Sequence, residues 1–339
     1  MRAMSLGGVS SFDERPDPLK LVDIPVPQPG PEEIRLRVAV CGVCHTELDE
    51  IEGRTLPPVF PVIPGHEVVG YVDEVGQGVT KFQVGDRAGV GWIHSSCGAD
   101  DENLSDEFQA TGRDVNGGYA EYMTVGQGYA YPIPDIFSDA EAAPLLCAGA
   151  VGYRALRLAG IKKGQRLGLT GFGGSGHIVL QLARHMYPGI EIFVFARSAA
   201  EREFAMDLGA HWSGDTENQP PQQLHGIIDT TPAWRPVLAA MKALRPGGRL
   251  VINAIRKEQA DRHLMADISY AEHLWMEKEL KTVANVTSRD ISGFLSVAAE
   301  IPLKPAIRTY ALEDANVALR DLKAGHIRGA FVLEIAKKQ

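Results

Sequence analysis

A cluster of glycines between a buried strand and a long helix constrains the fold of this 339-residue chain more than any other feature. The segment 171–176, Gly-Phe-Gly-Gly-Ser-Gly, follows an expected buried strand at 166–170 and precedes the helical stretch 177–186. Glycine permits a tight turn there and lets backbone N–H groups approach a pyrophosphate at the helix N-terminus. A glycine-rich turn without a ligand is the alternative interpretation. We therefore expect a dinucleotide site whose cofactor-binding residues include Gly171, Gly173, Gly174, Ser175 and Gly176.

Strand-like and helix-like stretches alternate on both sides of this turn. A helix is expected over 145–158, before the glycine turn. Strand-like runs follow the turn at 190–195, 226–229 and 249–253, with a further helix at 199–208. Alternation of this kind predicts a parallel, doubly wound Rossmann sheet.

The first 150 residues differ from this part, because they are mostly β-like. The segment 34–40 alternates apolar and basic residues, as a half-buried strand should, and 68–75 and 88–92 are further short apolar runs. A helix over 312–323 and a strand over 330–335 follow near the end of the chain. The α/β chain is thus expected to contain a β-rich catalytic domain (1–150), a dinucleotide-binding domain (151–287) and a return to the catalytic domain (288–339).

The composition is ordinary for a globular protein, with 45% hydrophobic and 23% charged residues. A net charge of −9 gives no reason to expect nucleic acid or an anionic membrane as a partner. The chain has neither a signal-peptide h-region nor an apolar run of roughly 18 residues that could span a membrane. Four cysteines in a chain of this length do not form a disulfide framework. We therefore expect a cytoplasmic protein, in which cysteines near histidines indicate metal binding.

The end of the second Rossmann strand indicates which dinucleotide is used. NAD-binding proteins carry a carboxylate there, about 20 residues after the glycines, which bonds the ribose hydroxyls. This chain has Arg197 and Ser198 in that place and no carboxylate. Because a guanidinium pairs with a 2′-phosphate that a carboxylate would repel, we expect NADP(H) to be favoured over NAD(H). An arginine that is merely solvated at a strand end is the alternative.

Three separate segments offer metal-ligand side chains: 41–46 (Cys-Gly-Val-Cys-His-Thr), 65–67 (Gly-His-Glu) and 145–147 (Leu-Leu-Cys). Two thiolates and one imidazole would form a zinc site with a fourth position open to water or substrate, which is typical of catalytic rather than structural zinc. Each segment is a weak signal by itself. A cysteine on an apolar helix is usually a core residue, and Cys-x-x-Cys is also a redox motif.

These segments also resemble a known family. The pattern Gly65-His-Glu-Val-Val-Gly70, followed by Gly76 and Val79, is similar to the signature of zinc-containing alcohol dehydrogenases of the medium-chain superfamily. The resemblance continues, in the family's order, through 84–87 (Val-Gly-Asp-Arg), 116–122 (Asn-Gly-Gly-Tyr-Ala-Glu-Tyr), 143–147 (Ala-Pro-Leu-Leu-Cys) and the glycine turn. It implies a GroES-like fold for the β-rich domain. It also implies an NAD(P)-dependent oxidoreductase that interconverts alcohols and aldehydes or ketones by hydride transfer.

The resemblance implies a metal site as well. Cys44, His66 and Cys147 would hold one catalytic zinc ion, with Glu67 beside the metal. Cys41 would pack nearby without touching it.

Further residues would serve the substrate and the cofactor. By the same resemblance, Thr46 would present its hydroxyl to an alcohol made more acidic by the zinc, and His45 and Arg328 would lie at the cofactor phosphates. Trp92 would line the substrate pocket, although the sequence is nearly as compatible with an ordinary core tryptophan.

Two places depart from the family pattern. Many relatives have a histidine five residues after the first ligand, at the end of a proton relay, where this chain has Asp49. An aspartate with an ordinary pKa of about 4 is a poorer relay, so we expect Asp49 either to relay weakly or only to bond the cofactor ribose. Relatives also commonly carry four closely spaced cysteines for a structural zinc. Between Trp92 and Gly117 this chain has only Cys97, which predicts that the structural zinc is absent.

Two other functions stay open. One is a zinc-free quinone or enoyl reductase of the same superfamily, which the three ligand types oppose. The other is a non-catalytic NADPH-binding protein, which no residue favours. The expected partners are a small-molecule alcohol or aldehyde and further copies of the chain, in a dimer or tetramer, with no nucleic acid and no membrane.

Overall fold

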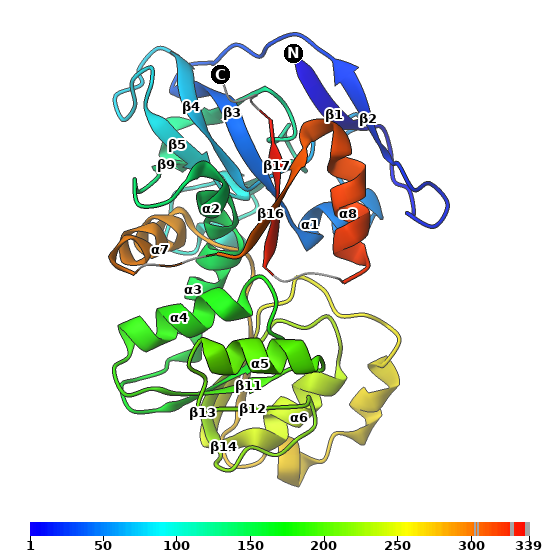
Figure 1. The fold of residues 1–339 in the computed structure, drawn as a ribbon, viewed down its shortest axis with the longest axis vertical. Coiled ribbons are helices and arrows are strands. Elements are labelled where there is room, and N and C mark those ends of the chain that lie inside the picture. Colours follow the sequence, from blue (N-terminus) through cyan, green and yellow to red (C-terminus); the bar gives the residue numbers. More distant parts are fainter. Residues whose placement is uncertain (302, 304, 326–328, 336–339) are drawn as a thin grey trace. The chain divides into compact units, whose positions relative to one another are not determined.

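The computed structural model describes residues 1–301, 303, 305–325 and 329–335, and contacts divide the chain into two units (Figure 1). One unit comprises Met1–Ala150 with Val286–Gln339, and the other comprises Val151–Asn285. Within the described part of the chain, no helix has the length and apolar character needed to cross a membrane.

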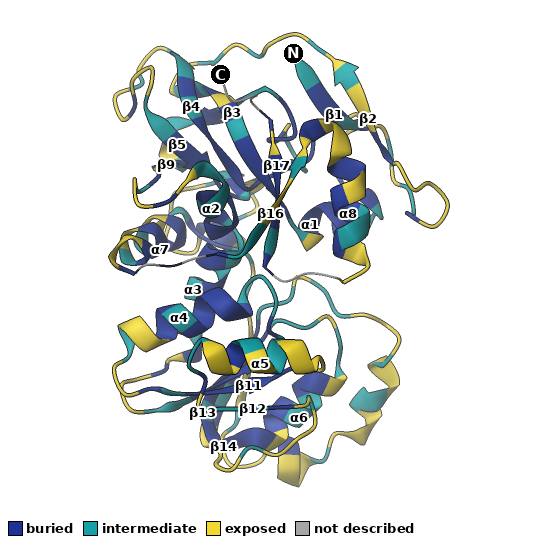
Figure 2. Cartoon of the chain, viewed as in Figure 1, coloured by how far each residue is buried: buried dark blue, intermediate teal, exposed yellow. Residues whose placement is uncertain are grey.

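The first unit is built on a seven-stranded sheet in the order β16-β17-β3-β4-β5-β9, with β8 also paired to β3. Its strands are β3 (Glu33–Val43), β4 (Val68–Val75), β5 (Arg87–Val90), β8 (Tyr122–Gly126), β9 (Ala130–Pro132), β16 (Ile307–Ala311) and β17 (Ala330–Glu334). Buried side chains of β3 and β4 join one apolar core with β17 and α8 (Ala315–Lys323), and Figure 2 shows the buried central strands. Strand β17 runs antiparallel to β3, with Phe331 opposite Val43, directly before Cys44.

Shorter elements of this unit surround the sheet. The strands are β1 (Arg2–Leu6), β2 (Leu19–Asp23), β6 (Ile93–Ser95) and β7 (Gln109–Ala110). The helices and single turns are α1 (His45–Ile51), η1 (Glu102–Leu104), η2 (Gln127–Tyr129), α2 (Asp139–Ala142), η3 (Ala143–Leu146), α7 (Ser288–Glu300) and η6 (Leu312–Asp314). Helix α3 (Ala148–Ala159) begins in this unit and continues into the second.

The second unit is a six-stranded sheet in the order β12-β11-β10-β13-β14-β15, and every neighbouring pair is parallel. Its strands are β10 (Arg166–Thr170), β11 (Glu191–Phe195), β12 (Trp212–Gly214), β13 (Leu224–Asp229), β14 (Leu244–Ile252) and β15 (Glu279–Thr282). The helices and turns are α4 (Gly176–Met186), α5 (Ala199–Asp207), α6 (Arg235–Ala243), η4 (Arg262–Asp267) and η5 (Tyr270–Leu274). The order reverses between β10 and β13, so the expected doubly wound Rossmann fold is confirmed.

Most expected elements occur near their predicted bounds. The strands at 68–75 and 166–170 match β4 and β10, whereas the strand expected over 88–92 ends at Val90. The continuous helix expected over 145–158 is wrong. Pro144 lies in the first turn of η3, that 3-10 turn ends at Leu146, and Cys147 has φ −123° and ψ −73° before α3 begins. The break separates the Cys147 backbone from both helices, which apolar periodicity alone cannot reveal.

Candidate metal and dinucleotide sites

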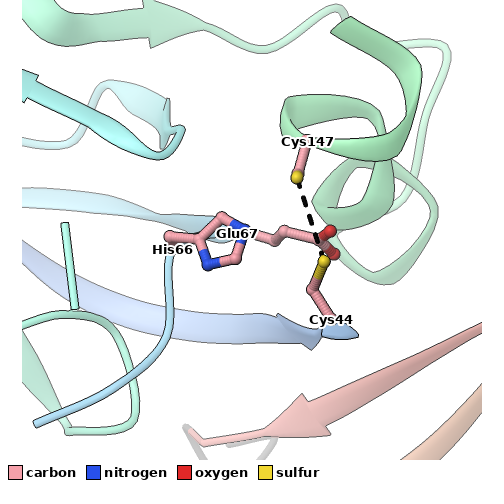
Figure 3. A group of neighbouring side chains, drawn as sticks. All are labelled: Cys44, His66, Glu67 and Cys147. Atoms are coloured by element: carbon pink, nitrogen blue, oxygen red, sulfur yellow. Dashed lines mark hydrogen bonds between the residues drawn. The ribbon is translucent and has the colours of Figure 1, made fainter. Parts of the chain in front are cut away.

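The four side chains expected around a metal converge from three places in the first unit (Figure 3). Cys44 follows β3, His66 and Glu67 precede β4, and Cys147 lies in the break between η3 and α3. Their ligand atoms all lie within 4.8 Å of one another, and the two Sγ atoms are 4.0 Å apart. Separations of this size allow one small cation to contact all four groups.

The chemistry of the donors fits zinc. Two sulfurs, one imidazole nitrogen and one carboxylate oxygen are the donor types that zinc binds, in tetrahedral sites of three or four protein ligands. His66 is fully buried, and its Nε2 has no hydrogen-bond partner among the described residues. A buried ring nitrogen of that kind is costly unless it binds something.

A second carboxylate orients the histidine. Oε1 of Glu47 lies 2.6 Å from Nδ1 of His66, and both side chains are fully buried. The other oxygen of Glu47 accepts a hydrogen bond from the backbone N–H of Cys44 at 2.8 Å, which caps the start of α1. Because Nδ1 faces Glu47, Nε2 is the nitrogen that remains for a metal. Sequence reasoning missed Glu47, although an acidic residue three positions after a helix start is a recognisable capping signal.

The pKa values of these four side chains are shifted in different directions. A hydrogen bond with Cys147 lowers the pKa of Cys44 well below that of an ordinary thiol, and His66 acts in the same direction. That shared bond raises the pKa of Cys147, and burial raises the pKa of Glu67. Burial alone would lower the pKa of His66, but Glu47 and Cys44 raise it well above its usual value. Cys44 is therefore the first thiol to ionise, as a metal ligand must.

Helix α1 carries the residues expected to serve the substrate alcohol, the proton path and the cofactor. The Thr46 hydroxyl lies 3.6 Å from Sγ of Cys44, and Asp49 is three residues further along the same helix, so both share one face. Asp49 is fully buried, and its Oδ1 accepts a hydrogen bond from Nε of Arg54 at 2.6 Å. His45, the first residue of α1, is exposed.

Aromatic and small residues line the surroundings of the cluster. The Trp92 ring lies 6.3 Å from the His66 ring and 5.7 Å from that of Phe108, measured between centroids. Cys41 is fully buried in the apolar core. A Cβ atom on Gly65 would come within 3.0 Å of its sulfur, which shows how closely Cys41 packs behind the His66 segment.

The glycine turn has the conformation that the motif requires. Gly171 has φ +80°, and a Cβ there would approach Oγ1 of Thr230 to 2.7 Å. A Cβ on Gly173 would meet nothing within 4 Å, so the backbone there is open on that side. Gly174 and Ser175 complete the turn, and α4 begins at Gly176. An open glycine before a helix N-terminus is what close approach of a phosphate needs.

The end of the second Rossmann strand is basic. Arg197 and Ser198 are exposed between β11 and α5. A third residue, Arg202, donates from Nη1 to the carbonyls of Ala196 at 2.6 Å and Arg197 at 2.8 Å. Sequence reasoning missed Arg202, whose partners are backbone atoms. Arg328, expected at the cofactor phosphates, lies outside the described residues.

The segment after Trp92 is held by a carboxylate. Glu102 is 1% exposed and accepts hydrogen bonds from the backbone N–H and the hydroxyl of Ser288, at 2.6 and 2.7 Å. The Tyr129 hydroxyl donates to its other oxygen at 3.1 Å. Ser288 is the first residue of α7, so Glu102 joins this segment to a helix N-terminus. Cys97 is exposed nearby.

Comparisons with known proteins agree with this geometry. Residues 30–135 match the alcohol dehydrogenase GroES-like domain family. The chain is 41% identical to a probable alcohol dehydrogenase, AdhA, of Mycobacterium tuberculosis (strain CDC 1551 / Oshkosh), over 94% of this chain and 93% of that protein. It is 32% identical to an alcohol dehydrogenase of Geobacillus stearothermophilus, over 94% of this chain and 96% of that one. A solved cinnamyl alcohol dehydrogenase from Sorghum bicolor aligns with a TM-score of 0.81 at 26% identity, over 98% and 97% of the two chains.

A Rossmann unit with an open glycine turn, together with a β-rich unit that carries a Cys-His-Glu-Cys cluster, defines a dinucleotide-dependent dehydrogenase of the zinc type. With relatives of this similarity, the chain belongs to the zinc-containing alcohol dehydrogenase family of the medium-chain superfamily. It is an NAD(P)-dependent alcohol dehydrogenase, which interconverts alcohols and aldehydes or ketones.

Proposed function

We propose that this alcohol dehydrogenase holds a single zinc ion on Cys44, His66 and Cys147 and acts on a small alcohol or the corresponding aldehyde or ketone. The observation that carries the proposal is the convergence of these donors and Glu67 within 4.8 Å of one another, with His66 and Glu67 buried and the two cysteines half-buried. Zinc there supplies Lewis acidity to the substrate oxygen. Glu47 holds the imidazole in place, and Glu67 is the donor that substrate can replace.

The proton of the alcohol is handled by residues of α1. The Thr46 hydroxyl, beside Sγ of Cys44, would hydrogen-bond the substrate oxygen and accept its proton while donating its own to a ribose hydroxyl of the cofactor, from which a proton is released to solvent water. Asp49 is held by Arg54 at 2.6 Å, so we assign it to orienting the cofactor ribose rather than to proton transfer. Asp49→Asn should then raise KM for the cofactor without changing the shape of the pH–rate profile. A displaced limb of the profile would instead establish a relay through Asp49.

A chelator experiment tests the main proposal. The chain, purified with zinc, is assayed for NADPH oxidation with a panel of aldehydes, before and after dialysis against a chelator. We expect activity to be lost and to return with zinc, and Cys147→Ser to behave like the dialysed protein. Activity that persists without zinc would identify a zinc-free reductase, and the absence of activity with every carbonyl would favour a non-catalytic NADPH-binding protein.

The cofactor proposed is NADP(H) rather than NAD(H). Arg197 and Ser198 are exposed where a 2′-phosphate would lie, and Arg202 adds a third polar side chain beside them. His45 and Arg328 are proposed as contacts to the other phosphates. Arg197→Asp should lower kcat/KM with NADP by about 10- to 100-fold, through loss of one charge-assisted bond and added repulsion. With NAD the same change should have little effect, and equal losses with both cofactors would contradict the assignment.

A single zinc per chain is the second part of the proposal. The contacts of Glu102 with Ser288 and Tyr129 support it, because they fix the segment around Cys97 with hydrogen bonds. Metal analysis of the purified chain should give one zinc per chain, removed by substitution of Cys44. Two zinc ions per chain would contradict this.

We also propose a homo-oligomer built on the edge of the second sheet. Strand β15 is an edge strand in which all four residues are exposed. Tyr270, Trp275 and Leu280, on or before it, are 63%, 53% and 49% exposed. An edge strand that is unpaired on one side and lies next in sequence to exposed apolar side chains favours pairing with another strand. Leu280→Lys should shift the mass measured by light scattering to that of a monomer, and an unchanged mass would exclude this edge. A cytoplasmic location stays a prediction.

A further inference from the structure

The second sheet carries a polar cluster at the place where its strand order reverses. Thr170 and Asp229 are the last residues of β10 and β13, and they lie opposite each other in the parallel register. In open α/β sheets, ligands bind at the carboxyl ends of the strands where the order reverses. A group buried at this point is therefore close to any dinucleotide that the sheet binds.

The cluster is centred on the carboxylate of Asp229, which is fully buried. Its Oδ1 accepts hydrogen bonds from the hydroxyls of Thr170 at 2.5 Å and Thr231 at 2.8 Å. Its Oδ2 accepts from Nζ of Lys257, which also donates to the carbonyls of Thr231 at 2.7 Å and Ala233 at 3.0 Å. All three ammonium protons are thus used within the protein. Lys257 is not a phosphate ligand here, and it ties the segment after β14 to the end of β13.

Asn253 lies in the chain between the end of β14 and Lys257, in the segment that Lys257 ties to the end of β13. It follows the last residue of β14, and its backbone N–H donates to the carbonyl of Asp229 at 2.7 Å. Both polar atoms of its side chain, Oδ1 and Nδ2, are buried and have no hydrogen-bond partner among the described residues. A buried amide that bonds nothing is costly. The Asn253 side chain thus offers one donor, Nδ2, and one acceptor, Oδ1, to a ligand at the carboxyl ends of the strands.

The position of Asn253 indicates which part of a dinucleotide it meets. The glycine turn and Arg197 belong to the half of the sheet formed by β10, β11 and β12, which takes the adenosine side in this fold. Asn253 belongs to the other half, with β13, β14 and β15, which takes the nicotinamide side. Nicotinamide carries a primary carboxamide, which offers one acceptor and two donors. A side-chain amide is complementary to that group.

We propose that Asn253 binds the carboxamide of the nicotinamide ring, and that the Lys257–Asp229 pair positions it. This rests on the proposed function only in requiring that the chain bind NAD(P). It adds a residue that distinguishes nicotinamide from other pyridine rings. The residues proposed to contact the 2′-phosphate, such as Arg197, recognise the other end of the cofactor.

The test compares cofactors that differ in one group. The zinc-loaded, full-length protein is titrated with NADPH by fluorescence, and NADP⁺ and its 3-acetylpyridine analogue are measured by competition. The analogue keeps a carbonyl but lacks the NH₂ group. We expect the wild-type protein to bind NADP⁺ about tenfold more tightly than the analogue, and Asn253→Ala to weaken NADP⁺ by a similar factor. In Asn253→Ala, the preference for NADP⁺ over the analogue should disappear.

Two variants keep the result interpretable. Gln165 directly precedes β10, at the amino ends of the strands, and its Oε1 accepts a hydrogen bond from the backbone N–H of Lys162. The Gln165→Ala protein lacks this side-chain amide and should bind both cofactors as the wild-type protein does. Lys257→Arg retains the charge and should preserve the preference for NADP⁺, whereas Lys257→Met should reduce it. An Asn253→Ala protein that still prefers NADP⁺ over the analogue by the wild-type factor would overturn the inference. Such a result would show that the Asn253 side chain does not contact the carboxamide of the cofactor. A wild-type chain that binds no dinucleotide would overturn the proposed function itself.

Discussion

Replacing Glu47 with glutamine tests whether one buried carboxylate sets the zinc affinity. Its Oε1 lies 2.6 Å from Nδ1 of His66, and its Oε2 accepts from the backbone N–H of Cys44 at 2.8 Å. When His66 binds metal through Nε2, Nδ1 carries a hydrogen, so both partners present a donor to the carboxylate. A glutamine of the same shape has one oxygen and one NH₂ group. It can accept only one of the two bonds.

The expected size of the effect follows from that count. A hydrogen bond to a charged group contributes about 1.5–3 kcal/mol, and changes in groups that orient zinc ligands typically reduce metal affinity about 10- to 100-fold. We therefore expect the zinc Kd of Glu47→Gln to rise by about 10- to 100-fold. The assay is competition with a chromophoric chelator near neutral pH. Circular dichroism of the zinc-loaded variant checks that it is folded.

A matched control lies on the same helix. Glu50 is as buried as Glu47, at 1% against 0% exposure, and burial raises the pKa of Glu50 well above its usual value. No hydrogen bond joins Glu50 to a zinc ligand among the described residues, and burial disfavours its charged form, so Glu50→Gln should reduce zinc affinity much less than Glu47→Gln does. The reasoning would be refuted if Glu47→Gln bound zinc as tightly as wild type, or if both variants lost affinity equally.

Three further predictions concern other parts of the chain. Lys257→Met leaves Asp229 buried without its counter-charge and should destabilise the chain by about 3–5 kcal/mol in urea unfolding. The double variant with Asp229→Asn should recover most of this, and no recovery would show that packing rather than charge is responsible. Glu102→Ala removes the acceptor from the N-terminus of α7, at a cost of about 1.5–3 kcal/mol. Proteolysis between residues 96 and 110 should accelerate at unchanged zinc content, and an unchanged rate would contradict the role of Glu102. Finally, the raised pKa of His66 keeps the metal-free imidazole protonated near neutral pH, so zinc must displace a proton. Apparent zinc affinity should rise with pH, because His66 and Cys147, whose pKa values are both raised, must each lose a proton to bind zinc. The rise should be less steep in His66→Ala, and an equally steep rise in that variant would exclude His66 as a ligand.

Much of the Rossmann unit could be predicted from the sequence. Its central strand β10 is buried from Leu167 to Thr170, so 166–170 could be recognised as a buried strand, and the glycine turn follows at once. The metal-ligand side chains could be named because the family spacing is specific. Prediction failed where a residue acts through backbone atoms or through a segment distant in sequence. Arg202 and Lys257 bond loop carbonyls, and no side-chain pattern marks these contacts.

Glu47 and Cys147 illustrate two further limits. Glu47 matches a helix-capping pattern, but its contact with His66 depends on how α1 lies against the start of β4. For Cys147, the apolar residues around it suit a continuous helix, and only tertiary packing reveals the break. In both cases the residue types of the segment predicted a helix or a helix cap. They did not predict the contact of Glu47 with His66 or the break in the helix at Cys147.

The pairing of β17 with β3 has a consequence for the order in which the protein matures. Strand β3 leads directly to Cys44, yet its neighbour on one side is formed by residues 330–334, near the end of the chain. During synthesis all the proposed zinc ligands have been added by residue 147, but the sheet that holds the first of them is still incomplete. Durable metal loading is therefore expected only after β17 has been synthesised and paired with β3. A truncation before Ala330 should impair zinc retention although it removes none of the proposed zinc ligands.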